Sequence, residues 1–597
     1  MARISEQTST TRFLSRDAAP SAKTLMTEIL VRPLDNVSFD TERQWLRRYG
    51  FIVAAYIATT LATGAYWLGD TPDYVESIVQ FSRGVDHWMW DFAHLLWRPL
   101  GWVLYSAFAP VTSVFVGKNE HLNVMVTLNA VSWLAGLVCV VCIYSLARRM
   151  SGRAWIANVV SLSFVFTQVF LNWAQAGSAY VPGLALLLVG FRISITRGED
   201  PARAGRMSVL AGIALGGAVC LWVPYLLAVP AAVVAPLCLF GFTRERFRFA
   251  LQTAITSALF TGSVYLAVIA GLRMQTLGEV RTWIALSGHG ADYSGVKRMV
   301  FGFARSFINM GNDGLLFKRY LLSDPFNPVS LRDLLGTTLC KLGLFYLFAG
   351  SLILSLFRLS HGKRILALFI VNAVPVMGLA FFFASSEPER YLPLFPALFI
   401  AIASCLGAPS RAFKAVAVVF LPVMVITNLA VVAKPVLDRQ QEAAVSRVRD
   451  LLPRLDERSV VFAATYQDDL MTFNRTFPFH PINRTGRLHL SALVSPGTSW
   501  NLHWREDFAS RVLATWRAGG ATWISKRAFS QRPRPEWNWA EGDDRRVSWK
   551  DFPLLCNQFE LGEDVGGPDG FVQLIASPRN EQFLAPLAAK SHPMTHA

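Results

Sequence analysis

Charge is scarce in this sequence. Asp, Glu, Lys and Arg make up 16% of its 597 residues, whereas 53% are hydrophobic, and the mean hydropathy is +0.35. An average soluble domain carries about 25% charged residues. The composition therefore excludes an ordinary soluble protein and indicates an integral membrane protein with soluble parts.

The cysteines provide neither a disulfide framework nor the spacing of a zinc site. Of the seven, only Cys556 lies in the polar C-terminal part of the chain. The other six fall in apolar segments: Cys139, Cys142, Cys220, Cys238, Cys340 and Cys405. Cys139 and Cys142 form a CxxC pair, but aliphatic residues surround them, which predicts two small side chains in a buried helix.

Several other signals are missing. Residues 1 to about 45 contain no short apolar core followed by a cleavage site, so we expect no removable signal peptide. The net charge of +16 and the pI near 9.7 come mainly from short basic clusters between apolar runs, without the basic stripe and interleaved aromatics of a nucleic-acid surface. No GxGxxG or P-loop appears in the C-terminal part, so we assign it no nucleotide.

What the chain does contain is about eleven apolar runs near the roughly 20 residues that a membrane-spanning helix needs. They are 49–68, 122–147, 154–173, 178–195, 207–224, 225–242, 249–271, 336–357, 364–384, 391–407 and 412–433. Arginine and lysine cluster in every second connection, beginning with Arg148, Arg149 and Arg153. The positive-inside rule makes that side cytoplasmic.

This alternation predicts the domain organisation. We expect a cytoplasmic tail at 1–48, a transmembrane domain at 49–433 with external loops 70–121 and 272–335, and an external, periplasmic domain at 434–597. The stretch 99–117 is apolar enough to span, but an extra span there would move every later arginine outward. We therefore expect amphipathic or re-entrant helices in that loop, with Pro99 breaking the second of them.

The predicted fold class is an all-α polytopic membrane bundle with a C-terminal external α/β domain. Residues 441–455 and 506–518 are expected to be helical, and 459–464 and the stretch after Gly519 to be strands. Helix and strand alternation of this kind is typical of a layered α/β domain. The expected location is the inner (plasma) membrane.

Three carboxylates, Asp70, Asp73 and Glu76, stand where the first apolar run ends on the external side. One acid beside a proline would be explained as a helix cap or turn. Three acids followed by an aromatic and basic loop favour a functional site. Further candidates lie in the three external segments: His94 and Arg98 in 70–121, His289 and Arg298 in 272–335, and Arg390 in the short turn 385–393.

Acids at an outer membrane boundary, opposed by Arg, His and Lys, suit a reaction between a lipid-anchored phosphate and a hydroxyl or amine. The carboxylate would act as general base, and the cations would hold the phosphate and stabilise the charge that develops on it. Because these loops face away from the cytoplasm, where nucleotide sugars are made, a sugar on a polyprenyl phosphate is the expected donor.

The motifs resemble the polytopic GT-C glycosyltransferases, in the branch of the protein mannosyltransferases and lipid A aminoarabinose transferases. The resemblance covers roughly 49–407 and rests on the order of five segments. These are Gly69-Asp70-Thr71 with Tyr74, Asp91 to Gly101, Leu146 to Arg149, Phe170 to Ala174 with Leu184 to Leu187, and the Pro388-Glu389-Arg390-Tyr391-Leu392-Pro393 turn.

The resemblance implies an inverting transfer in which Asp70 is the catalytic base. Many relatives have two adjacent acids at that point, whereas this chain has Asp70 and Asp73, which leaves the role of the second acid open. Asp73, Glu76 and His94 are candidates for binding the acceptor or a divalent cation. Arg98, His289, Arg298 and Arg390 are candidates for binding the donor phosphate, although Arg390 could merely pair with Glu387 or Glu389.

Other functions remain open at this stage. The acceptor could be a lipid, an envelope glycan or a protein, and no cofactor is certain. The main alternative is a transporter or flippase of lipid-linked saccharides, and a third is an inactive scaffold for the external domain. Transporters place ionisable residues at mid-membrane, whereas these apolar runs are nearly free of Asp and Glu. Lys341 is the main exception, and it can reach the outer interface.

Overall fold

The computed structural model describes a helical bundle and a separate C-terminal sheet domain. The described residues are 42–63, 70–85, 89–198, 205–287, 295–310, 316, 320, 329–383, 386–408, 410–437, 446–456, 458–465, 490–494, 504–529 and 551–589. The chain divides into two units, Met1–Gly50 and Phe51–Ala597. The first is described only where helix α2 (Glu42–Thr63) begins.

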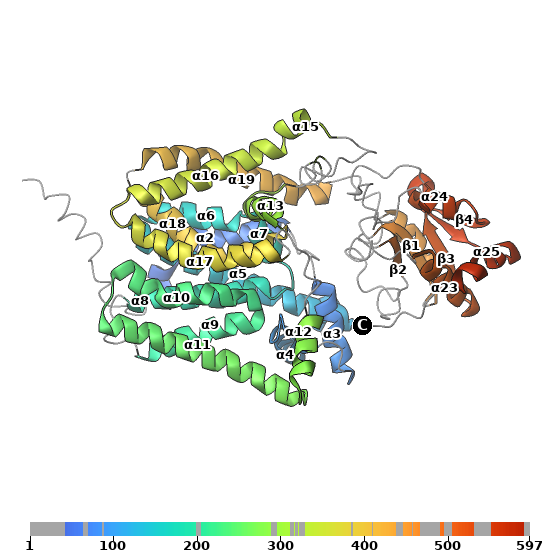
Figure 1. Cartoon of the computed structure of the whole chain (residues 1–597), viewed down its shortest axis with the longest axis horizontal. Helices are drawn as coiled ribbons and strands as arrows, with labels where there is room; N and C mark the ends of the chain where they lie inside the picture. Colours follow the sequence, from blue (N-terminus) through green and yellow to red (C-terminus); the bar gives the residue numbers. More distant parts are fainter. Residues whose placement is uncertain are drawn as a thin grey trace, which may run out of the picture. The chain divides into compact units, whose positions relative to one another are not determined.

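Long helices of the bundle lie side by side in Figure 1. Within the described residues, nine helices are long and apolar enough to cross a membrane. The main helices of the bundle include two shorter apolar helices, α6 (Ala154–Val165) and α9 (Gly205–Leu221). The others are α5 (Glu120–Ser151), α8 (Tyr180–Gly198), α10 (Val229–Phe240), α11 (Arg244–Gly271), α16 (Thr338–Arg358), α17 (Gly362–Phe382), α18 (Phe395–Gly407) and α19 (Arg411–Leu437).

The predicted spans correspond to helices, with two interruptions on the side predicted to be external. The run predicted at 154–173 is α6 followed by the short helix α7 (Gln168–Trp173), because the chain turns at Phe166. The run predicted at 225–242 starts as a 3-10 helix, η2 (Val223–Ala228), before α10. Both η2 and α10 have a proline in their first two positions, which fits the end of one helix and the beginning of the next.

The predicted loop 70–121 contains two helices, α3 (Thr71–Ser82) and α4 (Trp97–Val116). The predicted break at Pro99 is wrong, because Pro99 lies in the first turn of α4, where its missing N–H would have no helical partner in any case. Figure 1 shows α3 and α12 (Leu277–Leu286) lying across the ends of the long helices. By length and composition α4 could also cross a membrane, so its external position stays a prediction.

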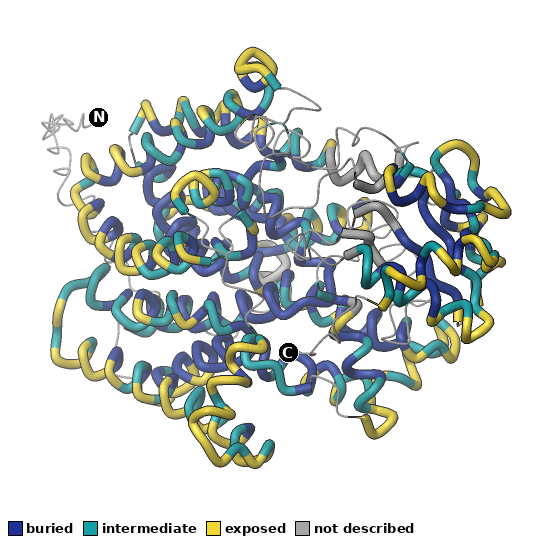
Figure 2. Tube along the Cα trace, turned by 45° about the vertical axis from the view of Figure 1, so that its right-hand side comes forward, coloured by how far each residue is buried: buried dark blue, intermediate teal, exposed yellow. Residues whose placement is uncertain are grey.

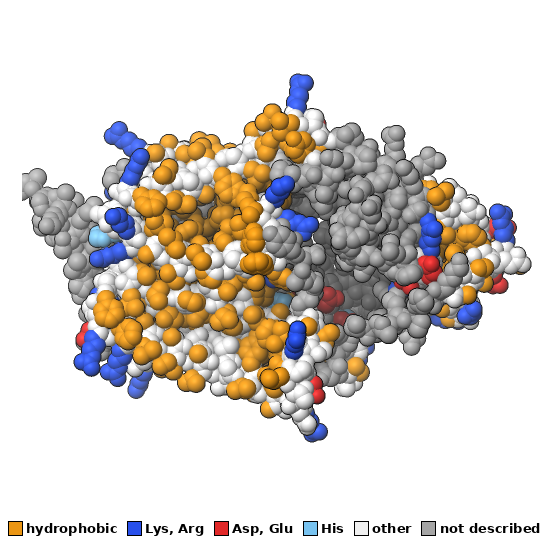
Figure 3. All heavy atoms as spheres, in the orientation of Figure 1, with side chains coloured by type: hydrophobic (Ala, Val, Ile, Leu, Met, Phe, Trp, Pro, Cys, Tyr) orange, Lys and Arg blue, Asp and Glu red, His pale blue; other side chains and the backbone are white. Residues whose placement is uncertain are grey.

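The bundle surface is apolar. Figure 3 shows hydrophobic side chains over most of the face of the bundle, and Figure 2 shows that the buried residues lie on the inner sides of its helices. Leu259 and Leu266 on α11, for example, are 65% and 66% exposed. An apolar surface of this extent is not expected on a soluble monomer. It fits contact with lipid chains.

The C-terminal domain is a layered α/β structure, as predicted. Its sheet has the order β2-β1-β3-β5-β4, with parallel pairing of β1 to β2 and β3 and antiparallel pairing of β5 to β3 and β4. The strands are β1 (Val460–Thr465), β2 (Leu490–Val494), β3 (Thr522–Ser525), β4 (Leu561–Val565) and β5 (Phe571–Leu574). Helices α23 (Trp504–Arg517) and α25 (Pro578–Ala588) contribute to one hydrophobic core, and Val448 and Leu451 to another.

One buried amide joins three elements of the bundle. The side chain of Asn428 in α19 donates to the carbonyl oxygens of Phe166, at the end of α6, and Phe307, at the end of α13 (Gly295–Phe307), at 2.6 and 2.7 Å. Its Oδ1 accepts from the backbone N–H of Asn309 at 2.7 Å. Three backbone groups at helix ends are thereby satisfied where water is scarce.

We predict that Asn428→Ala destabilises the bundle, because it leaves these backbone groups without a partner. A buried unsatisfied group costs about 1–3 kcal/mol, so the free energy of unfolding in detergent micelles should fall by about 3 kcal/mol. Ile426→Ala is the matched control, because Ile426 lies on the same helix and is 68% exposed. Equal loss in the two variants would show that the amide does not hold these ends together.

Candidate active site

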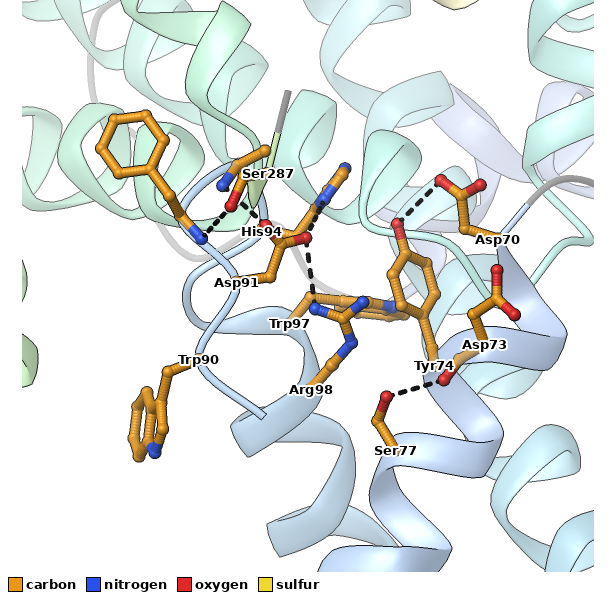
Figure 4. A network of polar contacts seen from close by, with 12 residues as sticks. Asp70, Asp73, Tyr74, Ser77, Trp90, Asp91, His94, Trp97, Arg98 and Ser287 are labelled. Carbon is orange, nitrogen blue, oxygen red and sulfur yellow. Dashed lines mark hydrogen bonds and ion pairs between the residues drawn. The ribbon is translucent and has the colours of Figure 1, made fainter. Parts of the chain in front are cut away.

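Asp70 stands at the N-terminus of α3 but does not cap it. The residue occupies the N-cap position, yet its side chain makes no capping hydrogen bond. Instead its Oδ2 accepts hydrogen bonds from the hydroxyls of Tyr74, at 3.3 Å, and Tyr180, at 3.4 Å. The Tyr74 contact is visible in Figure 4. The Asp70 carboxylate therefore does not act as a helix cap, which is the alternative explanation for this residue.

The two tyrosines come from different helices. Tyr74 lies one turn after Asp70 on α3, and Tyr180 is the first residue of α8. Burial, together with the Asp70 carboxylate, raises the pKa of the Tyr74 hydroxyl well above its ordinary value, which keeps it protonated as a donor. Oδ1 of Asp70 makes no hydrogen bond within the described residues. The carboxylate is thus fixed through one oxygen and free at the other.

Aromatic rings surround Tyr180. The rings of Trp173 and Trp222 meet it edge to face, with centroids 4.6 and 4.8 Å away. Its backbone carbonyl accepts a hydrogen bond of 2.5 Å from the hydroxyl of Tyr225. These contacts determine the ring position and hence the direction of the hydroxyl that holds Asp70.

A second polar cluster, formed by Asp91, His94 and Arg98, lies beside the first (Figure 4). Asp91 Oδ2 is 3.0 Å from Nδ1 of His94 and 3.2 Å from Nη1 of Arg98. Nη1 of Arg98 is close enough to Asp91 for an ion pair, but neither Nη1 nor the buried Nε has a hydrogen-bond partner among the described residues. The Arg98 guanidinium also lies over the Tyr74 ring, 4.9 Å from its centroid.

Asp91 is ionised in this setting. Burial alone would raise its pKa, but the hydrogen bond from His94 and the positive charges of His94 and Arg98 outweigh burial and hold the pKa well below its ordinary value. A hydrogen bond to the Ser287 hydroxyl acts in the same direction. Asp91 therefore carries a negative charge throughout the neutral pH range.

Neighbouring elements fix the irregular segment that carries this cluster. The indole N–H of Trp283 in α12 donates to the carbonyl of Trp90 at 2.7 Å, and the hydroxyl of Tyr265 in α11 donates to that of Phe92 at 2.9 Å. The N–H of Phe92 donates to the Ser287 hydroxyl at 2.9 Å. A segment whose backbone is satisfied by side chains of two other helices can hold its own side chains in place.

Arg390 reaches the same region from η3 (Pro388–Leu394). Its guanidinium donates twice to Glu387 Oε2, at 2.9 and 3.2 Å, as the pairing alternative predicted. It also lies 5.8 Å from the ring centroid of Trp222 and 4.7 Å from that of Phe383. Tyr180 is within electrostatic range of both Asp70 and Arg390. The fold thus brings the first and the late external motifs to one place.

The other predicted candidates are distributed differently. Glu76 is half-buried and accepts from Nε2 of His121 at 2.9 Å and from Gln80 at 2.6 Å. Burial would raise its pKa, but these hydrogen bonds lower it below the ordinary value. Asp73 is exposed in the first turn of α3. No group of three or more His, Cys, Asp or Glu that could hold a metal occurs in the described part of the chain, so Asp73, Glu76 and His94 do not converge as ligands.

The loop 272–335 supplies Trp283 and Ser287 to the segment that carries Asp91, and the two residues predicted in it are not among these contacts. Arg298 lies on α13 and is exposed. His289 falls outside the described residues. Sequence reasoning missed Tyr180, Trp222 and Asp91 as site residues. Tyr180 and Trp222 could not be selected, because aromatic residues at the ends of spans are common membrane-interface anchors and their types and positions alone do not mark a site.

We predict that Asp91→Asn destabilises the fold in a pH-dependent way. Removing one partner of a buried ion pair costs about 3–5 kcal/mol, so the free energy of unfolding should fall by about 3 kcal/mol at pH 7. Because the folded pKa of Asp91 is lowered, its contribution is complete above its ordinary pKa, near 4. The contribution is lost as the pH falls through the lower folded value.

Denaturant unfolding of the purified chain in micelles between pH 7 and pH 3 measures this difference. Glu120→Gln is the control, because Glu120 pairs with Arg83 at the surface and should contribute less than about 1 kcal/mol. A loss for Asp91→Asn that stays constant down to the lowest pH would indicate lost packing and not lost charge.

The comparisons with known proteins support the fold. No family model and no curated protein sequence matches the chain. Among solved structures, ArnT from Cupriavidus metallidurans is similar in its apo state at 13% identity, over 89% of this chain and 98% of that chain, with a TM-score of 0.50. The structure of the same ArnT bound to undecaprenyl phosphate is similar at 14% identity, over 89% of this chain and 99% of that chain, with a TM-score of 0.51.

AglB, the oligosaccharyltransferase of Archaeoglobus fulgidus, is similar in its complex with an inhibitory peptide and a dolichol-phosphate. The identity is 12%, over 87% of this chain and 73% of that chain, with a TM-score of 0.44. ArnT is a lipid A aminoarabinose transferase of the GT-C superfamily. The similarity of ArnT over nearly the whole of both chains confirms the predicted resemblance at the level of the fold: this chain is a polytopic membrane bundle with a C-terminal α/β domain, and its fold is similar to that of ArnT.

Proposed function

We propose that this chain is a membrane glycosyltransferase that moves a sugar from a polyprenyl-phosphate donor to a hydroxyl or amine of an envelope lipid, glycan or protein. The observation that carries the proposal is the Asp70 carboxylate, held by two tyrosine hydroxyls in the region that also contains the buried Arg98 and the partly buried Arg390. ArnT, whose fold is similar, has been crystallised with undecaprenyl phosphate. That complex supports a polyprenyl phosphate as the donor class.

In the proposed reaction Asp70 is the general base. The acceptor attacks the anomeric carbon on the side opposite the phosphate, its proton passes to Oδ1 of Asp70, and the bond from the anomeric carbon to the phosphate oxygen breaks. Attack from the opposite side inverts the configuration. The hydrogen bonds from Tyr74 and Tyr180 hold Oδ2 and so leave Oδ1 to receive the proton.

The two arginines are proposed to bind the phosphate. Arg98 carries unpaired, buried N–H donors, and a phosphate oxygen would satisfy them. Arg390 lies over the ring of Trp222 and is within electrostatic range of Tyr180, as Asp70 is. Fixed cations in a site partly shielded from water stabilise the charge that develops on the leaving phosphate. No step uses a metal, and the roles proposed from sequence for Asp73, Glu76, His289 and Arg298 are not required.

The proposed orientation follows from charge. Basic residues occupy the connections at one end of the bundle, whereas Asp70, Asp91 and Arg390 lie in the connections of the opposite parity. The positive-inside rule then places the N-terminus in the cytoplasm, and the site and C-terminal domain outside, at an inner (plasma) membrane. A donor whose lipid tail stays in the bilayer can present its sugar there.

The distribution of acids favours an enzyme over a flippase of lipid-linked saccharides. In α5, α8 to α11 and α16 to α19, Asp and Glu occur only within the first two residues of a helix. A transport path would need ionisable groups near the middle of the membrane. Lys341, the exception noted in the sequence, lies in the first turn of α16. Its Nζ donates to the backbone carbonyl of Asn309 at 3.3 Å.

We predict that Asp70→Asn abolishes sugar transfer without unfolding the protein. The amide oxygen can still accept from Tyr74 and Tyr180, but an amide cannot take the acceptor's proton. The rate of transfer should fall by at least about 100-fold. The measurement is the rate at which polyprenyl-phosphate-linked sugar is consumed in membranes containing the full chain. Glu120→Gln, at the exposed pair with Arg83, should transfer like the wild type. Retained transfer by Asp70→Asn would remove Asp70 as the base.

We predict that Arg390→Ala weakens donor binding more than acceptor binding. The expected loss is about tenfold in donor affinity, which corresponds to one charge-assisted hydrogen bond, measured by displacement of bound undecaprenyl phosphate. Glu387→Gln is the informative partner variant, because it keeps the arginine and removes the charge that occupies it. If both variants lose affinity equally, Arg390 acts only through its ion pair with Glu387.

A further inference from the structure

His94 has one ring nitrogen that the fold does not use. Its side chain is buried, and its Nδ1 is bound to Asp91. Its Nε2 is buried as well and has no hydrogen-bond partner within the described residues. Leaving such a group unpaired costs about 1–3 kcal/mol. Together with the buried Nε and Nη1 of Arg98, which also lack hydrogen-bond partners among the described residues, this atom indicates a place that a polar ligand would complete.

We propose that His94 is a catalytic acid that gives the proton on Nε2 to the phosphate oxygen of the departing polyprenyl phosphate. This proposal rests on the glycosyl transfer proposed above and adds an acid to its base. When the bond between the anomeric carbon and the phosphate oxygen breaks, its electron pair stays on that oxygen. The phosphate takes the Nε2 proton and leaves as the singly charged monoester, and His94 becomes neutral.

The protons balance over the step. The acceptor loses one proton to Asp70, and His94 loses one to the phosphate, so the chain as a whole holds the same number before and after. Proton exchange with water then returns Asp70 to its ionised form and His94 to its protonated form. No oxidant, reductant or further reactant takes part.

The surroundings of His94 suit this role. Asp91 accepts from Nδ1, which leaves Nε2 as the ring nitrogen that can exchange a proton with a ligand. Arg98 is the opposing cation, and it shares Asp91 with His94. These are the charged groups that lie against the imidazole.

Two tyrosines complete the surroundings and link the acid to the base. The ring of Tyr74 lies 5.6 Å from that of His94, and the ring of Tyr180 lies 5.9 Å from it. Both hydroxyls hold Asp70. In Figure 4 the free nitrogen of His94 points away from Asp91, on the side toward which the Tyr74 hydroxyl and the Asp70 carboxylate also lie. A donor between them would meet the base on one side and the acid on the other.

The test uses undecaprenyl phosphate as the probe, because it is the leaving group whatever the sugar and acceptor are. The purified full chain in lipid nanodiscs is loaded with this lipid and titrated between pH 5 and pH 9 by phosphorus NMR. A phosphate and an imidazole that share a proton titrate as a coupled pair. We expect two separated inflections in the phosphorus shift of the wild type and one inflection in His94→Gln.

The outcomes separate the two proposals. A single inflection in the wild type, identical to that of His94→Gln, overturns the role of His94 while leaving the donor class in place. No signal from bound lipid in the wild type overturns the donor class and the role of His94 with it. His361→Gln, at the start of α17 among the basic connections, is the control and should keep both inflections.

Sugar transfer gives the second measurement. His94→Gln should lower kcat by about 100-fold with little change in KM for the donor. The wild-type rate should fall toward high pH, because a proton donor must carry its proton to act, and the variant should lose that fall. A variant that unfolds at the wild-type temperature but shows the wild-type pH profile would reduce His94 to a structural residue.

Discussion

The hydrogen bond between the Tyr180 hydroxyl and the Asp70 carboxylate is the contact on which the site depends. It joins the start of α8 to the start of α3, two elements 110 residues apart in the chain. Tyr74 adds a second donor from one turn further along α3. With both donors on Oδ2, the carboxylate has a fixed direction before any substrate arrives, and preorganisation of this kind is what a positioned base requires.

The environment around that contact is set by the bilayer. Inside a membrane, backbone groups must be satisfied by the protein itself, so irregular segments survive only where side chains from other elements bind them. The segment from Trp90 to Leu96 meets this requirement through Trp283, Tyr265, Ser287 and the backbone of Cys220. Asn428 does the same for the ends of α6 and α13. The end of the bundle that carries the candidate site can therefore be both irregular and rigid.

The sequence predicted the bundle, its segments and the α/β domain, because apolar length and helix or strand periodicity are local properties. It also selected Asp70, His94, Arg98 and Arg390, since ionisable residues stand out in an apolar chain. It could not select Tyr180 or Trp222, because a tyrosine or tryptophan at the end of a span is ordinary. The pairing of Glu76 with His121, 45 residues away, likewise depends on how α3 packs against α5. Pro99 was misjudged because a proline in the first turn of a helix does not break it.

The two polar clusters differ in whether they can accept or release a proton. In one, Asp70 offers a free carboxylate oxygen and its tyrosines stay protonated, so it can accept a proton. In the other, Asp91 is held in its ionised form by His94 and Arg98, and in the proposed reaction His94 is the group that releases a proton. Acid and base assignments follow from environments that push neighbouring titratable groups apart. A scaffold that had lost its chemistry would have no need to keep a carboxylate half-free and an imidazole nitrogen unpaired within one wall of aromatic rings.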